Sequence, residues 1–182
     1  MAENAQSLLG AWTNFYVMLG SSAAALTGLM FVVLTLIAGT EPVRRSPEGI
    51  SAFTTPTVLH FATALLISVN FVAPWRSLVH ATIVPGLIGL YGVVHIARVI
   101  VIARRFRRYT PDLEDWIWYF TLPLISHGAV LAGAIMLAYN AINALFIIAG
   151  GAVLLIFIGI RNAWDVVTFI IIDDVQDPPR AD

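Results

Sequence analysis

Five long apolar segments, separated by polar or proline-containing stretches, dominate the pattern along this chain of 182 residues. A helix needs about 20 mostly apolar residues to cross the hydrocarbon core of a bilayer. By that measure the pattern predicts five transmembrane helices, at about residues 15–39, 53–73, 83–103, 116–139 and 141–160. The predicted fold is therefore all-α: one membrane domain over residues 1–182, arranged as a polytopic helix bundle.

The fourth and fifth segments are separated only by the residues "NAIN". Together they are far too long for one crossing, so the sequence predicts a helical hairpin. Asparagine side chains readily bond nearby backbone groups in turns. We therefore expect Asn140 and Asn143 to bond the exposed backbone of this turn.

The fifth segment contains two charged residues, Arg161 and Asp165, before its apolar pattern resumes over residues 166–172. A span over 151–172 would place both charges near the bilayer centre, where each costs at least about 2.5–3.5 kcal/mol. A span over 141–160 instead places Arg161 at the membrane interface. The sequence therefore favours the span over 141–160.

In this register the helix is predicted to continue to about residue 172, followed by a short polar cytoplasmic tail over 173–182. The continuation includes the apolar residues "VVTFIII", which would be exposed outside the bilayer. Such a surface needs cover. We expect that cover from the membrane interface, from the segment "LEDWIWYF" or from another chain.

The basic residues are all arginine, and they are distributed unevenly between the two sides of a five-span arrangement. Only Arg76 falls on one side, whereas the other side has Arg44, Arg45, Arg104, Arg105, Arg107, Arg108, Arg161 and Arg180. Cytoplasmic loops carry the excess of Lys and Arg. The sequence therefore predicts that the N-terminus is outside and the C-terminus cytoplasmic.

Aromatic residues fit the same orientation, because Trp and Tyr are enriched at both membrane–water interfaces. We expect an outer ring formed by Trp12, Tyr16, Trp75 and Tyr139. We expect an inner ring formed by Tyr109, Trp116, Trp118 and Trp164.

Composition agrees with a membrane protein, since 59% of the residues are hydrophobic and only 12% are charged. Soluble domains average about 45–50% apolar and about 25% charged residues. The chain has no cysteine, which excludes disulfides, thiol chemistry and Cys-ligated metal sites. Its N-terminus lacks the cationic start of a signal peptide. The main environment predicted for the chain is the lipid bilayer.

Catalytic signatures such as H-E-x-x-H and G-x-S-x-G are absent from the sequence, so we predict that the protein is not an enzyme. The basic run "RRFRRY" is short and adjoins a predicted span. It is typical of an orientation signal or of a contact with anionic headgroups. It does not predict nucleic-acid binding.

Small residues recur at helical spacing within several predicted spans. They are Gly20, Ala24 and Gly28 in the first span, Gly89 and Gly92 in the third, and Ala129 and Gly133 in the fourth. Small residues at such spacing let two helix backbones approach closely. The pattern predicts tight packing within the chain, or an interface with a second copy or another membrane protein, and the spacing does not separate these alternatives.

Ionisable side chains within the predicted spans are the candidate functional residues: His60, His95, Arg98 and His127. Such residues at membrane depth should face protein or water. At about 1.5 Å per residue, His60 and His95 lie roughly 15 Å deep, near the bilayer centre.

A candidate interfacial charge cluster is predicted near the end of the fifth span. Arg161 and Asp165 are spaced to pair with each other as i and i+4. Arg98 follows Tyr91 and His95 along one helix face, and it could reach the cytoplasmic interface or pair with Asp165. We expect Asp165 to accept hydrogen bonds from Arg98 or Arg161.

Three interpretations of the histidines stay open. In the first, they satisfy internal hydrogen bonds, which needs only one or two partners for each imidazole. His60, His95 and the Ser/Thr side chains near them could form a proton or ion path. His60 and His95 could ligate haem or a metal, but no ligand spacing supports this, so no cofactor or metal is predicted.

At "NFYVMLGSSAAALTGLMFVVLTLIAG", "TPTVLHF" and "IGIRNAWDVVT" the chain resembles a group of uncharacterised small bacterial integral membrane proteins. The resemblance spans most of the chain and implies a multi-pass protein of the bacterial inner membrane. It implies no activity.

Two function classes follow from these observations. The favoured one is a non-enzymatic membrane protein that acts through self-association or as a subunit of a membrane assembly. The alternative is a small ion or proton channel, or a transporter subunit, that uses the histidines at membrane depth. A haem- or metal-binding subunit is the remote third possibility.

Overall fold

The computed structural model describes residues 2–37, 47–105 and 113–176, and these residues form an all-α structure. Its long helices are α1 (Ala2–Ile37), α3 (Pro47–Val72), α5 (Ile83–Arg105), α7 (Leu122–Met136) and α8 (Ala141–Gln176). Its short elements are α4 (Leu78–Ala81), α6 (Leu113–Asp115) and the π-helix η1 (Trp116–Thr121). The prediction of an all-α fold is confirmed.

Four helical segments are long and apolar enough to cross a membrane: Ala5–Leu36, Leu78–Val101, Leu113–Met136 and Ala141–Thr168. The matching apolar part of α3, Pro56–Val72, is shorter. The chain is thus a helical bundle with several elements of membrane-spanning length.

Some predictions concern residues outside the described part of the chain, namely Arg44, Arg45, Arg107, Arg108, Tyr109 and Arg180. The side chains of Arg104 and Arg105 also lie outside it.

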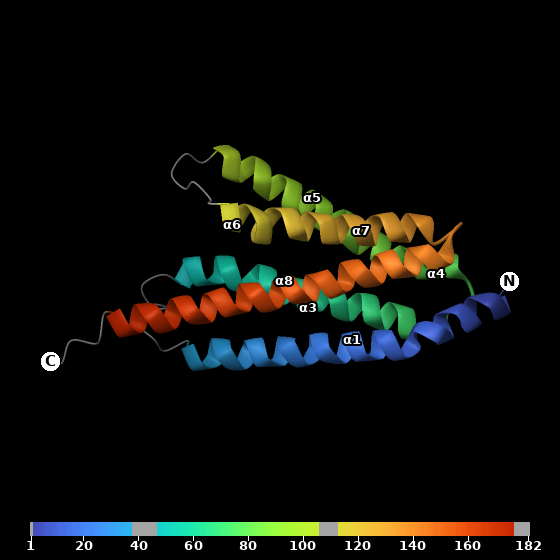
Figure 1. The fold of residues 1–182 in the computed structure, drawn as a ribbon, viewed down its shortest axis with the longest axis horizontal. Coiled ribbons are helices and arrows are strands. Elements are labelled where there is room, and N and C mark those ends of the chain that lie inside the picture. The colour runs from blue at the N-terminus through green and yellow to red at the C-terminus, as the bar shows by residue number, and fades with distance from the viewer. Residues whose placement is uncertain (1, 38–46, 106–112, 177–182) are drawn as a thin grey trace.

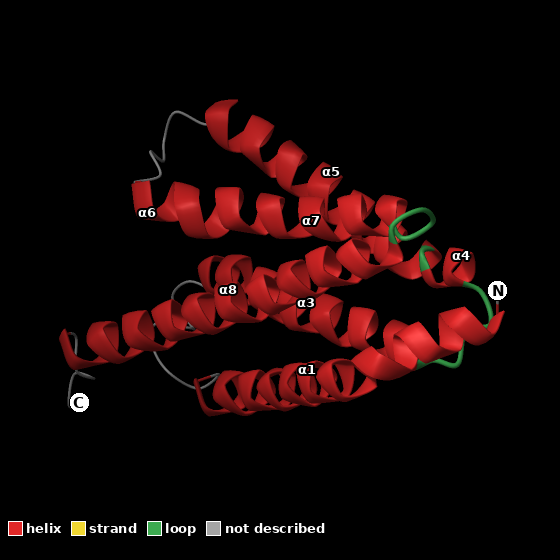
Figure 2. Cartoon of the chain, turned by 45° about the vertical axis from the view of Figure 1, so that its right-hand side comes forward, coloured by secondary structure: helices red, strands yellow, loops and turns green. Residues whose placement is uncertain are grey.

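The long helices run alongside one another (Figures 1 and 2). Each packs on the next in the order α1, α3, α8, α7 and α5, whereas α5 packs only lightly on α3. The start of α1, α4 and the α7–α8 turn lie at one end of the bundle, here named the α4 end. The last turns of α1, α5 and α8 lie with α6 at the opposite end, the α6 end.

Helices α7 and α8 form the expected hairpin. The backbone N–H groups of Tyr139 and Asn140 donate to the carbonyl of Met136, which closes α7. The Asn140 Oδ1 atom accepts a hydrogen bond from the backbone N–H of Asn143, 3.5 Å away, at the start of α8. Helix α8 then runs without a break through Arg161 to Gln176.

Helix α1 starts at Ala2 rather than near Phe15, because its apolar stripe continues through Ala5 and Leu9, which are both buried. Further along the stripe, the Trp12 ring packs edge-on against Phe146 of α8, with 4.7 Å between ring centroids.

Tyr16 belongs to the same stripe, and its ring stacks on Phe71 of α3 with 4.9 Å between ring centroids. Tyr16 is fully buried, so its expected place in an outer aromatic ring is wrong. The ring fills the contact between α1 and α3 instead.

Close helix packing uses some of the predicted small residues. A Cβ atom added to Gly20 of α1 would lie 2.9 Å from the Ser68 Cβ of α3. A Cβ on Gly133 of α7 would lie 2.5 Å from the Ile148 side chain of α8. Ala129 also adjoins α8, since its Cβ lies 3.4 Å from the Cβ position of Gly151.

Two positions of the small-residue pattern in α1 do not pack this way. A Cβ on Gly28 would meet no atom within 4 Å, and Ala24 is exposed. Their small size is therefore not needed for packing within the described part of the chain.

Asn162 of α8 is fully buried, and neither polar atom of its side-chain amide has a hydrogen-bond partner among the described residues. An unpaired buried polar group typically costs about 1–3 kcal/mol. We expect Asn162→Leu, which keeps the branched shape, to raise the free energy of unfolding by about 1–2 kcal/mol. Thermal or SDS-induced unfolding in detergent measures the change.

Asn14→Leu, at an exposed position of α1, is the control and should change stability less. A loss of stability in Asn162→Leu would mean that the amide is bonded in the native protein, for instance by a buried water.

Candidate functional site

A cleft of about 230 Å³ lies between α3, α5 and the η1–α7 segment, in the half of the bundle nearer the α6 end. It forms where α5 diverges from α3 (Figure 1). Three of the predicted residues line it: His60 from α3, His95 from α5 and His127 from α7. We name this the histidine cleft. Its other lining residues include Leu59, Tyr91, Ile96, Tyr119, Phe120 and Pro123.

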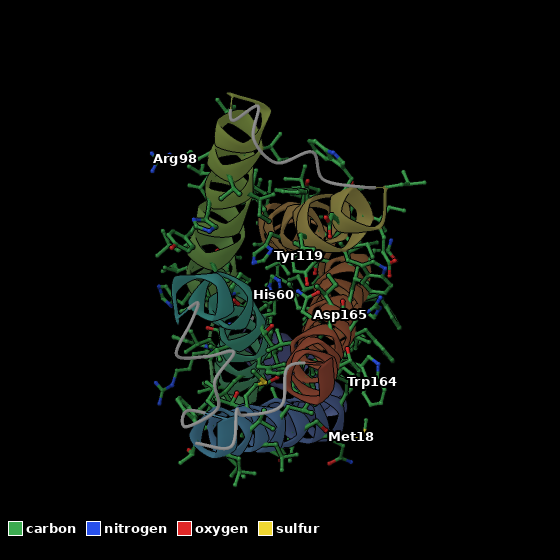
Figure 3. All side chains as sticks on the ribbon, turned by 90° about the vertical axis from the view of Figure 1, so that its left-hand side faces the viewer. Met18, His60, Arg98, Tyr119, Trp164 and Asp165 are labelled. Carbon is green, nitrogen blue, oxygen red and sulfur yellow. The ribbon has the colours of Figure 1, made fainter. Side chains whose placement is uncertain are left out.

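The π-helix η1 shapes one wall of the histidine cleft. Proline has no backbone N–H, and its ring clashes with the carbonyl four residues earlier in an α-helix. Pro123 lies at the start of α7, immediately after η1, so the wider π turn accommodates it. Tyr119 and Phe120 of η1 both line the cleft, and Figure 3 shows Tyr119 near His60 in the space between α3, α5 and α7.

His127 is held in one orientation by two features. Its Nδ1 donates to the Pro123 carbonyl oxygen 2.9 Å away, and since a carbonyl only accepts, the proton lies on Nδ1. Its ring edge, Cδ2 and Nε2, faces Gly92 of α5, where an added Cβ would overlap the ring. In the neutral ring, Nε2 therefore has no proton and is a hydrogen-bond acceptor beside Gly92.

His60 lies opposite, with 6.0 Å between its ring centroid and that of His127. It is 7% exposed, and its Nδ1 is buried without a hydrogen-bond partner among the described residues. A buried acceptor without a partner is less unusual than a buried N–H without one. This favours the tautomer of His60 with its proton on Nε2.

His95 is exposed, unlike the other two histidines of the cleft. Its ring stacks on Tyr91 with 5.8 Å between centroids and 16° between planes. Arg98 follows on the same helix, and it is exposed and points outward from α5, away from Asp165 (Figure 3). The structure therefore does not bring Arg98 to Asp165.

Arg161 is the partner that the structure gives to Asp165, and the two form an ion pair along α8. Arg161 also bonds Glu114 of α6, and its guanidinium lies over the Trp118 ring, 5.8 Å from the centroid. This charge cluster joins α8 to the "LEDWIWYF" segment. The sequence pattern identified the pair within α8 but not Glu114, because sequence spacing carries no information about a neighbour 47 residues away.

Tyr119, Phe120 and Pro123 are among the cleft residues that sequence reasoning missed. A proline within an apolar helical pattern was the available signal, since it marks a disturbed turn, and π turns are frequent at functional sites.

The metal and haem interpretations concern the histidines of this cleft. Within the part of the chain that the structure describes, no three His, Asp or Glu side chains are grouped to hold a metal ion. His60 lies beside His127, and His95 lines the same cleft.

The histidine cleft ends near Gly92 and His127, and close packing follows toward the α4 end. A Cβ on Gly89 of α5 would lie 2.7 Å from the backbone nitrogen of Leu131 in α7, so the two helix backbones almost touch there. The cleft is therefore a pocket that is closed at its end near Gly92 and His127. Such a pocket, with apolar walls and a few polar groups at its deep end, is typical of a small-molecule site.

Comparison with protein families, curated proteins and solved structures finds no match to this chain.

Proposed function

We propose that this chain is a non-enzymatic integral membrane protein of the bacterial inner membrane that works as one subunit of a larger membrane assembly. The observation that carries the proposal is the exposed polar face of α5, formed by Tyr91, His95 and Arg98. Polar and ionisable side chains at membrane depth normally face protein or water rather than lipid. A second protein surface over α5 would provide that cover.

The exposed face of α1 is different and serves as an internal comparison. Its exposed residues include the large apolar side chains of Met18, Phe31 and Leu36, and over residues 5–36 it exposes no ionisable side chain. Figure 3 shows Met18 pointing away from the bundle. Such a face suits lipid, so the two outer helices of the bundle differ in the neighbour that they require.

The positive charge of Arg98 limits which kind of partner can cover α5. A two-fold symmetric pair would use the same face on both copies. It would bring two Arg98 side chains to the same depth, and like charges there repel. This favours an assembly in which α5 meets a different surface, either on another copy or on another membrane protein.

Cysteine cross-linking tests this proposal, since the chain has no cysteine of its own. Single cysteines at Leu87 and Val94 on the exposed side of α5, each labelled with a photoreactive maleimide, should give cross-linked products in native membranes. Cysteines at Met18 and Phe31 on α1 should give little product. A product at about twice the 19.8 kDa chain indicates a second copy, and any other mass indicates a different protein. Equal product from both helices, or none from either, contradicts the proposal.

The proposal includes five crossings, with α3 as the second, and an outside N-terminus. Support comes from the alternation of helix ends in Figure 1 and from the arginine distribution. A reporter that is active only in the periplasm should give signal when fused at the N-terminus or after Trp75. It should stay silent after Arg108 or Asp182. The reverse pattern would show the opposite orientation.

A proton or ion path is the second candidate function, and the convergence of three histidines on one cleft favours it. The near-contact of the α5 and α7 backbones at Gly89 counts against a continuous path. Proton flux into liposomes that contain the protein, compared with flux into empty liposomes, separates the two functions. For the favoured function we expect no difference.

A further inference from the structure

The histidine cleft has a polar deep end and apolar walls. His60, His127 and Thr63 contribute polar groups at that end, and His95 and Asp115 also line the cleft, whereas Leu59, Ile96 and Val99 are apolar. From Asp115 to His127 the lining covers about 18 Å along the helix axis, at about 1.5 Å per residue. Leu59 and Val99 are also exposed on the outside of the bundle, so the cleft adjoins the surface that faces the membrane.

The two buried histidines are complementary in their hydrogen bonding. The proton on His127 Nδ1 leaves Nε2 as an acceptor, and the favoured tautomer of His60 has a donor at Nε2. One hydroxyl group can donate to the first and accept from the second. The deep end therefore suits a hydroxyl-bearing group.

The lining also discriminates between classes of lipid. It contains no Arg or Lys among the described residues, and it includes Asp115. Phosphate and carboxylate groups are normally recognised by Arg, Lys or backbone N–H groups. Anionic phospholipids and fatty acids are therefore poor candidates. The rings of Tyr119, Phe120 and His127 instead provide surfaces for a planar ring.

We propose that the histidine cleft binds a neutral lipid whose head is a small hydroxylated ring, of the quinol class. The ring lies among the aromatic residues, one hydroxyl bridges His60 and His127, and the apolar tail leaves past Leu59 and Val99 into the bilayer. Tyr91 and His95 line this cleft and also belong to the proposed subunit contact, so the two sites adjoin. The binding test uses the chain alone in nanodiscs, so its outcome does not depend on that contact.

Binding of decylubiquinol to the full-length protein in nanodiscs tests the proposal, under argon and measured by equilibrium partition against empty nanodiscs. We expect saturable binding of one molecule per chain. His60→Ala and His127→Ala should each weaken it by about tenfold or more, because each removes one buried hydrogen bond. His80→Ala, at an exposed histidine outside the cleft, should not change it. Oxidised decylubiquinone lacks the hydroxyl donor and should bind about tenfold more weakly.

A second pair of variants covers the case in which the histidine variants fail to fold. Val99→Trp places a bulky ring at the exposed edge of the cleft and should abolish saturable binding. Val101 is somewhat more exposed on α5 (50% against 37% for Val99) and lies outside the cleft lining, so Val101→Trp should bind normally. Three results would overturn the proposal: non-saturable partition, equal binding in both tryptophan variants, or equally effective displacement by dioleoyl phosphatidylglycerol.

Discussion

Replacing Gly89 with alanine is expected to destabilise the protein strongly, by about 2–3 kcal/mol, near the upper end of the range for overpacked cores. The added Cβ would lie 2.7 Å from the backbone nitrogen and 2.9 Å from the Cα of Leu131. Backbone atoms of a packed helix cannot rotate away as a side chain can. Helices α5 and α7 would therefore have to separate.

The matched control for this prediction is Gly128→Ala in α7. A Cβ at Gly128 meets no atom within 4 Å, and alanine is favoured over glycine in helix interiors by about 0.8–1.0 kcal/mol. This variant should be as stable as the parent or slightly more stable. Thermal unfolding in one detergent compares the two variants. If Gly89→Ala were as stable as Gly128→Ala, α5 would not pack on α7 as described.

Replacing Arg161 with alanine is the second substitution expected to have a large effect, lowering stability by about 2–3 kcal/mol. It leaves two carboxylates, Asp165 and Glu114, without this cation and removes the link between α8 and α6. The side chains of Arg161 and Asp165 are each 31% exposed, so the effect should lie between those of exposed and buried ion pairs.

Two control variants isolate the contribution of the charge cluster. Arg76→Ala removes an exposed arginine near the α4 end and should change stability by less than about 0.5 kcal/mol. Arg98→Ala should leave stability equally unchanged, since Arg98 points away from Asp165. If Arg98→Ala were as destabilising as Arg161→Ala, the arginine of α5 would belong to the cluster after all.

The part of α8 that crosses the bilayer can also be tested directly by chemical labelling. Single cysteines at positions 161 and 165 should react with a water-soluble thiol reagent from the cytoplasmic side, if these residues lie at that interface as the sequence predicts. Protection of both would place the pair within the bilayer and support the alternative register over 151–172.

Much of the helical architecture could be predicted from the sequence because it depends on local properties. Apolar runs set where helices form, and "NAIN" set the hairpin at Asn140. The i, i+4 spacing of Arg161 and Asp165 predicted a pair that the structure contains. These features require only the helical repeat and the cost of exposing polar groups to hydrocarbon.

The remaining features depend on which helices become neighbours, and helix spacing alone cannot determine that. Arg98 was an equally acceptable partner for Asp165 until the packing order placed α5 beside α7 rather than α8. His60 and His95 were considered together as lining a path or ligating a cofactor, and the order of helices adds His127 beside His60 in the cleft that all three line. Tyr16 was expected at an interface, but contact between α1 and α3 buries it.

The sequence by itself determined that this protein is an all-α chain with helices of membrane-spanning length, because apolar composition and helical period act within each segment. Only the tertiary structure decided that three histidines from three helices line one cleft, and that Glu114 joins the Arg161 pair. Each of these contacts joins residues far apart in the chain. The position of the cleft follows from the α5–α7 crossing, where the absence of a Cβ at Gly89 and Gly92 lets α5 approach the Leu131 backbone and the His127 ring.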